Sequence, residues 1–536
     1  MDKAERKEQS GEPAEPKLAP IVNTRDESST QTQVSVRSTL FDSSAVSQRF
    51  FLQHRKLLFL ISLASAYAIY VAGLQNNPPG FYVDESSIAY NAYTISQTGT
   101  DEYGNYWPIY FRAFGEYKNP VYIYILAAVF KVTGPSILAA RLLSATLGYA
   151  AALLLGLIVL RLSGSSIIAI FIAATALSTP WLFEVSRLVF EVALVPLALI
   201  VFLLALHHAY SKESWTLLGS IVVTATLGLF TYTYSECRLL GPLLAIGLVF
   251  FMTRSRWISI VQIWLAYAVA LVPLLMFSLQ NPGALTRRFD QLSYIPSNNT
   301  SVEIVSEFIL HYIRNVSLHA LLLSGDPNSR HHVSGMGSIL IATFILASMG
   351  IIIVFFGHRR NAWWRFVLYG LAVSVVPASL TKEDFHTLRL AAFPVFLLLF
   401  IAPTLVWMIA RSEKNRLWGK GILILMSLTL LQAIIFQMNY HREGPKRTSA
   451  FDAEFPTLLH ELIVSSDSAI YFTDTSYAHA YWYGTLEGLD KSRIIKLNRK
   501  ERPPEGALVI SQNKKVDESQ VIIKTGRFIA YLTAQQ

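Results

Sequence analysis

Long apolar runs alternate with short polar connectors over most of this chain of 536 residues. A helix needs about 20 mostly apolar residues to cross a bilayer, and several of the runs approach or exceed that length. The runs lie at about 57–74, 137–160, 165–180, 188–206, 215–231, 239–253, 257–278, 337–356, 364–380, 388–410 and 419–437. This pattern predicts a polytopic α-helical membrane protein with about 11 transmembrane helices, which together occupy residues 49–439.

Basic side chains mark one side of these predicted helices. With the amino terminus inside, the inner connectors contain Arg161, Lys212, Arg254, Arg256, Arg359, Arg360, Arg365, Arg411, Lys414, Arg416 and Lys420. Cytoplasmic connectors carry an excess of Lys and Arg, so this distribution predicts a cytoplasmic amino terminus. The apolar stretch 119–130 is only about 12 residues long, and counting it as a span would invert every later connector. We therefore interpret it as an interfacial or re-entrant helix on the outer side.

The remaining segments form two ends and two long outer loops. Residues 1–48 are rich in Ser, Thr, Gln, Glu and Lys without apolar periodicity, which predicts a disordered cytoplasmic tail. The first outer loop, 75–136, should contain two juxtamembrane helices, the first over 85–97, and the second outer loop covers 280–336. Residues 440–536 alternate helix-like and strand-like runs, which predicts a small extracytoplasmic α/β domain. We expect a multi-pass protein of the cell membrane, in contact with its lipids.

Composition and charge agree with this class. Of all residues, 52% are hydrophobic and 15% are charged, whereas soluble domains carry about 25% charged residues. The net charge of +9 lies mostly in the short connectors, without a basic stripe interleaved with aromatics, so we expect no nucleic-acid partner. The single cysteine, Cys237, excludes an intrachain disulfide and a cysteine-based metal cluster.

The first outer loop sets two adjacent carboxylates, Asp84 and Glu85, in the stretch "GFYVDESSIAYNAYTIS". The structural interpretation is that Asp84 caps a helix and Glu85 suits its dipole. A carboxylate fixed at a helix start beside the membrane is also suited to act as a general base, which makes both residues catalytic candidates. Neighbours on a helix do not face each other, so the pair does not form a two-carboxylate glycosidase site.

Further ionisable residues gather on the same side and are candidates for substrate binding. They are Glu116, Tyr117, Lys118, Arg187, Arg330, His331, His386 and Arg389. Ionisable groups at a membrane boundary are costly unless paired or hydrated, so they are functional candidates by default. Snorkelling side chains, the turn-forming segment 325–332 and a charged helix cap at 381–389 are the structural alternatives. The adjacent histidines His331 and His332 offer no zinc motif, so we predict no metal site, although a divalent cation stays open as a cofactor.

Several motifs resemble one family of membrane enzymes. "VDESSIAYNAYTI", "FGEYKNPVYIYILAAVF", "AARLLSATLG", "GDPNSRHHVSGMG" and "PASLTKEDFHTLRLAAFPVF" resemble GT-C class glycosyltransferases. The likeness is to the phospholipid carrier-dependent group, family 39, which includes protein O-mannosyltransferases and the lipid A aminoarabinose transferase, in its bacterial type. It covers about residues 57–437. The mannosyltransferases have "PP" after the acidic region of the first outer loop, where "KNPV" has one proline, and the loop 280–336 is too short for their long insertion. Both differences disfavour a eukaryotic-type mannosyltransferase.

The resemblance implies inverting transfer of a monosaccharide from a polyprenyl-phosphate donor on the outer face. Asp84 would take the proton from an acceptor hydroxyl or amine, and Glu85 would assist it or hold its geometry. The leaving phosphate would be bound by Lys118, Arg330, His331 and Arg389. A phosphate needs fixed cations rather than a general acid. The acceptor stays undetermined between protein, lipid and polysaccharide.

A transporter and an anchored docking module are the two alternatives to an enzyme. A transporter or flippase for lipid-linked glycans would place ionisable residues near mid-membrane on broken helices, often in repeated halves. Here the charges cluster on one side and no internal repeat is visible. A third hypothesis makes the carboxy-terminal domain a docking module anchored by the helices, but eleven spans exceed what an anchor needs. The sequence therefore favours a membrane glycosyltransferase.

Overall fold

The computed structural model describes residues 42–295, 299–498, 501–512 and 516–534. The chain divides into two compact units, residues 1–65 and 66–536, and the features below belong to the second except for the part of α1 before Ala66. Of the predicted disordered tail 1–48, residues 1–41 lie outside the described part, and helix α1 (Asp42–Val71) begins directly after them.

The described chain is mostly helical. Five segments are long and apolar enough to cross a membrane, namely α4 (Ile137–Ser163), η1 with α7 (Glu191–Leu194, Val195–Tyr210), α10 with α11 (Trp257–Ala270, Val272–Gln280), α17 with α18 (Phe393–Leu399, Ile401–Ser412), and α19 (Arg416–Glu443) continuing into η4 (Gly444–Lys446). Shorter apolar helices are the end of α1 from Phe59, α3 (Pro120–Thr133), α5 (Ser166–Ser178), α8 (Leu217–Thr231), α9 with η2 (Cys237–Gly247, Leu248–Phe251) and α14 (Ile341–Gly357). The polytopic helical class is thus confirmed, whereas the count of eleven spans stays a prediction.

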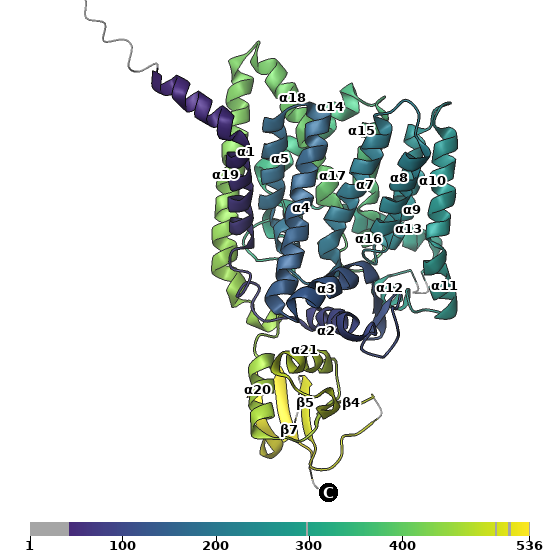
Figure 1. Ribbon diagram of the computed structural model, residues 1–536. Coiled ribbons are helices and arrows are strands. Elements are labelled where there is room, and N and C mark those ends of the chain that lie inside the picture. Colours follow the sequence, from purple (N-terminus) through teal and green to yellow (C-terminus); the bar gives the residue numbers. More distant parts are fainter. Residues whose placement is uncertain (1–41, 296–298, 499–500, 513–515, 535–536) are drawn as a thin grey trace, which may run out of the picture. The chain divides into compact units, whose positions relative to one another are not determined.

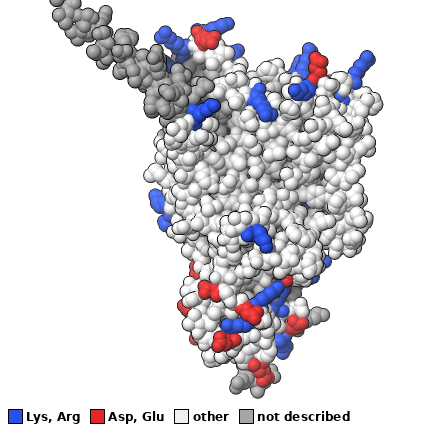
Figure 2. Space-filling view, in the orientation of Figure 1, with Lys and Arg blue, Asp and Glu red and all other residues white. Residues whose placement is uncertain are grey.

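Charged side chains are unevenly distributed over the surface. In Figure 2 most Lys, Arg, Asp and Glu side chains of the face shown gather towards its two ends, and the broad zone between them is almost entirely uncharged. A wide uncharged band is the surface that a bilayer requires, because a charged side chain at membrane depth is costly. The long helices run along this band in Figure 1.

Helix α15 (Ala362–Val373) packs within the bundle against α9 and α17. Short elements connect the longer helices, namely α2 (Val83–Thr98), β1 (Phe111–Ala113), β2 (Glu116–Lys118), α6 (Pro180–Val185), α12 (Arg287–Leu292), α13 (Ser301–Asn315), η3 (Ala320–Ser324) and α16 (Val376–Ser379). The first of these, α2, packs against α3, and 11 of its 16 residues are buried. Its capping residue is Tyr82, so Asp84 lies inside the first turn and is not the cap. This turn therefore holds Asp84 on a packed helix rather than on a loop.

The carboxy-terminal region forms a small α/β domain, as the sequence predicted. Its elements are η5 (Thr448–Ala450), α20 (Phe455–Ser465), β3 (Ile470–Phe472), α21 (Tyr477–Glu487), η6 (Lys491–Arg493), β4 (Ile494–Lys496), β5 (Leu508–Gln512), η7 (Glu518–Gln520), β6 (Val521–Thr525) and β7 (Phe528–Leu532). The sheet has the order β4-β3-β5-β7-β6, in which β3 is parallel to β4 and β5 while β7 is antiparallel to β5 and β6.

This domain packs on the outer-loop helices. Helix α21 contacts α2, as Figure 1 also shows. The ring of Trp482 stacks between Phe81 and Phe130, with ring centroids 5.8 and 5.6 Å apart. Gly80 has a φ of 67°, and a Cβ there would lie 2.5 Å from the carbonyl oxygen of Phe451, so only glycine allows this close approach. Aromatic stacking and the bare backbone at residue 80 together hold the domain beside the start of α2.

Candidate functional site

A polar cavity of about 280 Å³ lies where the short elements meet. Its walls come from the start of α2, strand β2, helix α12, the chain around residues 190–191 and 234–238, and the loops 328–331 and 383–389. Eight of the ten predicted site residues line it, namely Asp84, Glu116, Tyr117, Lys118, Arg330, His331, His386 and Arg389. The structure therefore brings together residues that are separated by up to about 300 positions in the sequence.

Asp84 and Lys118 form an ion pair on one wall. Strands β1 and β2 pair with Ala113 opposite Glu116, so Phe114 and Gly115 make a two-residue turn. Both turn residues have positive φ, 53° and 86°, as a type I′ hairpin turn requires. This hairpin carries Lys118 to the first turn of α2, where its Nζ donates a hydrogen bond to Asp84 Oδ1. The side chain of Asp84 is 27% exposed, so the carboxylate remains open to the cavity.

Lys118 is surrounded by carboxylates. Its Nζ lies 3.7 Å from Glu116 Oε1, and only 9% of its side chain is exposed. Burial of the ammonium group opposes its charge, but Asp84, Glu191 and Glu116 outweigh burial and raise the pKa of Lys118. Lys118 therefore stays charged beside Asp84 throughout the physiological pH range.

Glu191 and Glu236 are functional candidates that the sequence analysis did not single out. Glu191 accepts hydrogen bonds from the backbone and side-chain nitrogens of Asn119, and Arg238 Nη2 donates to Asn119 Oδ1 at 2.9 Å. Glu236 Oε1 lies 3.8 Å from Arg389 Nε, and burial raises the pKa of Glu236 although Arg389 opposes the shift. A signal existed for Glu191, because a carboxylate inside the apolar run 188–206 is expensive unless it has a role.

Two arginines lie on the loops 328–331 and 383–389, which form another part of the cavity wall. Arg389 Nη2 lies 2.7 Å from Glu383 Oε2, and its Nη1 donates to Thr381 Oγ1 at 2.9 Å. The guanidinium of Arg330 lies over the ring of Tyr82, 4.2 Å from its centroid. Among the described residues, no carboxylate oxygen comes within 4 Å of Arg330, whose nearest side-chain acceptor is Asn328 Oδ1 at 3.3 Å from Nε. This cation is thus available for an anion that enters the cavity.

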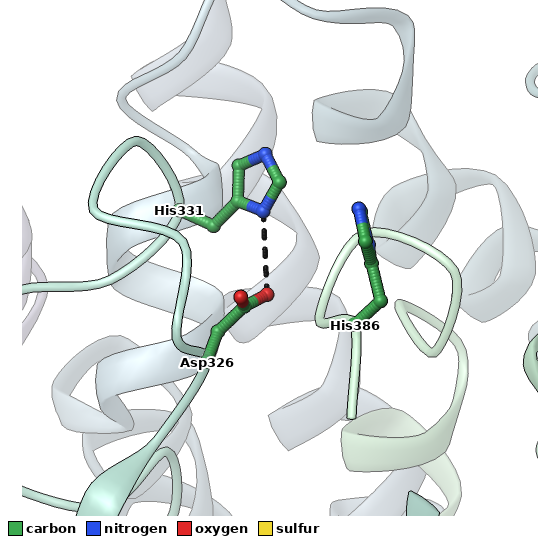
Figure 3. Close-up of side chains that lie close together, drawn as sticks. All are labelled: Asp326, His331 and His386. Atoms are coloured by element: carbon green, nitrogen blue, oxygen red, sulfur yellow. Dashed lines mark hydrogen bonds and ion pairs between the residues drawn. The ribbon is translucent and has the colours of Figure 1, made fainter. Parts of the chain in front are cut away.

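Two histidines, His331 and His386, lie together next to the buried carboxylate of Asp326 (Figure 3). Asp326 Oδ2 is 3.3 Å from His331 Nδ1 and accepts hydrogen bonds from the amide and hydroxyl of Thr387, at 2.8 and 2.6 Å. The ring centroids of His331 and His386 are 4.8 Å apart. Burial alone would raise the pKa of Asp326, but the neighbouring His331, His386 and Thr387 lower it below its usual value. Asp326 is therefore an ionised carboxylate that orients His331.

The same three side chains could hold a divalent cation. Asp326, His331 and His386 each offer one ligand atom, and these atoms all lie within 4.8 Å of one another. Imidazole nitrogen and carboxylate oxygen are ligand types of catalytic zinc sites, which keep a further position open. No zinc spacing is visible in the sequence, because these ligands come from two separate loops, one with Asp326 and His331 and the other with His386.

Glu85 and Arg187 do not line the cavity. Glu85 is fully buried and accepts hydrogen bonds from the amides of Tyr82 and Val189, at 2.8 and 3.0 Å. Burial raises the pKa of Glu85, and the nearby Arg141 opposes the shift. Arg187 is also fully buried, and it donates to backbone carbonyl oxygens of residues 70, 72 and 77 at 2.6, 3.0 and 3.4 Å. Both side chains therefore form hydrogen bonds to backbone groups and hold the segments 70–82 and 187–189 in place.

The comparisons with known proteins concern the fold. No protein-family model matches the chain, and no curated protein matches its sequence. Two crystal structures of ArnT from Cupriavidus metallidurans are similar to it. ArnT bound to undecaprenyl phosphate has a TM-score of 0.57 and 11% identity, covering 90% of this chain and 99% of ArnT. Apo ArnT has a TM-score of 0.55 and 11% identity, covering 90% and 100%. The GT-C-like fold that the resemblance implied is therefore confirmed, and the chain is a multi-pass membrane protein with the fold of ArnT.

Proposed function

We propose that this protein is an inverting membrane glycosyltransferase. It would move a monosaccharide from a polyprenyl-phosphate donor to an acceptor hydroxyl or amine. The observation that carries the proposal is the cavity whose lining contains both the partly exposed Asp84, paired with Lys118, and Arg330, a cation without a carboxylate partner among the described residues. A carboxylate base in one cavity with fixed cations suits a reaction whose leaving group is a phosphate. The fold supports the donor class, since ArnT has been crystallised with undecaprenyl phosphate.

Asp84 would act as the general base. It takes the proton of the acceptor hydroxyl while the acceptor oxygen attacks the anomeric carbon of the sugar. The bond between that carbon and the phosphate oxygen breaks, and the oxygen leaves with the electron pair as polyprenyl phosphate. One displacement inverts the anomeric centre. One base is enough, because the leaving phosphate needs no proton. Glu85, buried one residue further on, would hold the geometry of the first turn.

The cations of the loops 328–331 and 383–389 would bind the phosphate. Arg330, His331 and Arg389 all line the cavity. Fixed positive groups stabilise the charge that grows on the leaving oxygen, and they need no reorganisation during the reaction. A divalent cation held by Asp326, His331 and His386 would add Lewis-acid neutralisation of phosphate charge at this wall.

The proposed topology puts the reaction on the extracytoplasmic face of the cell membrane. The basic connectors favour a cytoplasmic amino terminus, and hence an outer location for the cavity and for residues 440–536. The catalytic domain would be residues 49–439, with the prenyl chain among its apolar helices. The acceptor could be a protein, a lipid or a polysaccharide.

The test uses purified protein in liposomes with a panel of polyprenyl-phosphate monosaccharides. Release of free polyprenyl phosphate is measured for the wild type, Asp84→Asn and Asp467→Asn. Asp467 is a fully exposed carboxylate of the carboxy-terminal domain and serves as the matched control. Loss of a general base costs about 10²- to 10⁴-fold in rate, so Asp84→Asn should release almost no polyprenyl phosphate while still binding donor.

The outcomes separate the candidate functions. Asp84-dependent release from one donor would support the transferase and identify the sugar. Full activity of Asp84→Asn would refute Asp84 as the base. Donor that crosses the bilayer intact, with no release, would replace the transferase by a transporter for lipid-linked sugars.

A further inference from the structure

A buried chain of hydrogen bonds joins the carboxy-terminal domain to α2, the helix that carries Asp84. Ser86 Oγ lies 3.0 Å from His479 Nδ1, and His479 Nε2 lies 3.0 Å from Asp452 Oδ2. Ser86 and His479 are 393 residues apart in the sequence. Arg527 Nη2 lies 2.7 Å from Asp452 and completes the chain. The residues Ser86, His479 and Asp452 have at most 1% of their surface exposed.

The order serine, histidine, aspartate is that of a hydrolase triad, but burial excludes that chemistry. A nucleophilic serine must meet an acyl substrate and an oxyanion hole, whereas Ser86 is 0% exposed and packed under α21. The hydrogen bonds instead define a fixed orientation. The carboxylate of Asp452 accepts from Nε2–H of His479, so Nδ1 is the acceptor for the hydroxyl of Ser86. Burial lowers the pKa of His479, although Asp452 opposes the shift, and the ring therefore stays neutral as this tautomer requires.

The geometry of α2 connects this chain to the cavity. Successive helical residues are turned by about 100°, so side chains two positions apart point to nearly opposite sides. Asp84 accordingly faces the cavity and Lys118, while Ser86 faces the carboxy-terminal domain. The amide of Ser86 also donates to the carbonyl of Tyr82 at 2.9 Å, which closes the first turn. A shift of Ser86 therefore moves Asp84.

We propose that the carboxy-terminal domain is a positioning part of the active site, in which His479, oriented by Asp452, fixes Ser86 and thereby sets Asp84 against Lys118. The inference rests on the proposed function, because it assumes that Asp84 is the base. A misplacement of about 1 Å at a reacting group can lower a rate by about a hundredfold, so a hydrogen bond behind the base is enough to affect turnover. His479 and Ser86 are positioning residues and touch no substrate.

The experiment is a double-mutant cycle on turnover. kcat and KM for the donor are measured in liposomes for the wild type, Ser86→Ala, His479→Ala and the double variant. We expect each single variant to lower kcat about tenfold with KM within about twofold, because donor binding depends on the cations of the loops 328–331 and 383–389. The double variant should lose little more than either single variant, since both remove the same hydrogen bond.

Two further variants separate positioning from folding. Ser87→Ala removes the neighbouring buried hydroxyl, which lines no part of the cavity, and should leave kcat unchanged. His479→Gln introduces a side-chain amide that can donate to Asp452 and accept from Ser86. It should therefore retain part of the activity that is lost in His479→Ala. If Ser86→Ala fails to fold, Ser86→Cys keeps the size with a weaker donor and takes its place in the cycle.

The inference and the proposed function fail in different ways. Unchanged kcat in folded Ser86 and His479 variants, or additive losses in the double variant, would overturn the positioning role while an inactive Asp84→Asn still supported the base. An equal loss in Ser87→Ala would show that the effect is general destabilisation of α2, which also overturns it. Full activity of Asp84→Asn would instead remove the base itself.

Discussion

The ion pair between Asp84 and Lys118 makes a quantitative prediction for Lys118→Met. Opposite charges about 4 Å apart attract by about 4 kcal/mol at the effective dielectric of a site near a protein surface. Removing the ammonium leaves the Asp84 carboxylate without the group that fixes its position, and it leaves Glu116, 3.7 Å away, without its partner. A misplacement of about 1 Å at a reacting group can lower a rate about a hundredfold, so kcat of Lys118→Met should fall by about that factor.

The measurement is the release of polyprenyl phosphate over a range of donor concentrations, which gives kcat and KM separately. Arg288→Met is the matched control, because Arg288 is a cation of the same cavity that lies 3.6 Å from Glu116 but is 60% exposed. An exposed pair contributes at most about 1 kcal/mol, so this variant should lower kcat by less than about fivefold. An unchanged kcat in Lys118→Met, with only KM for the donor raised, would refute the pairing argument and place Lys118 on the phosphate.

Two further predictions concern the phosphate wall and the domain contact. Arg389→Gln should raise KM for the donor about tenfold, because a charge-assisted contact to phosphate is lost. Arg314→Gln, which removes an exposed arginine paired with Asp384, is the control. An unchanged KM in Arg389→Gln would exclude Arg389 from phosphate binding. Burial raises the pKa of Glu102 to about 7, despite the opposing charges of Lys496 and Lys491. A carboxyl group whose pKa is raised in the folded state contributes stability that is complete below about pH 4.5 and lost as the pH rises through about 7. The melting temperature of the wild type relative to Glu102→Gln should therefore fall between pH 5 and 8, and parallel melting curves would contradict the assignment.

Local patterns in the sequence were enough for the class and for most of the candidate site. Hydropathy identified the helical segments, because the cost of placing a residue in lipid is a property of that residue. The concentration of ionisable groups on one side of the helices located the site, and eight of the ten predicted residues line the cavity. The alternation of runs in the last hundred residues also predicted the small sheet domain.

Partners across the fold were decided only by the tertiary structure. Whether a carboxylate faces a cavity or binds backbone depends on elements that are distant in sequence, and no local pattern records their approach. Glu85 and Arg187 look like site residues but are buried against amides and carbonyls, whereas Glu191 looks like part of a span and lines the cavity. The contact of Ser86 with His479 spans almost the whole chain. The sequence thus determined which residues favour water over lipid, and tertiary packing decided which of these residues contact one another.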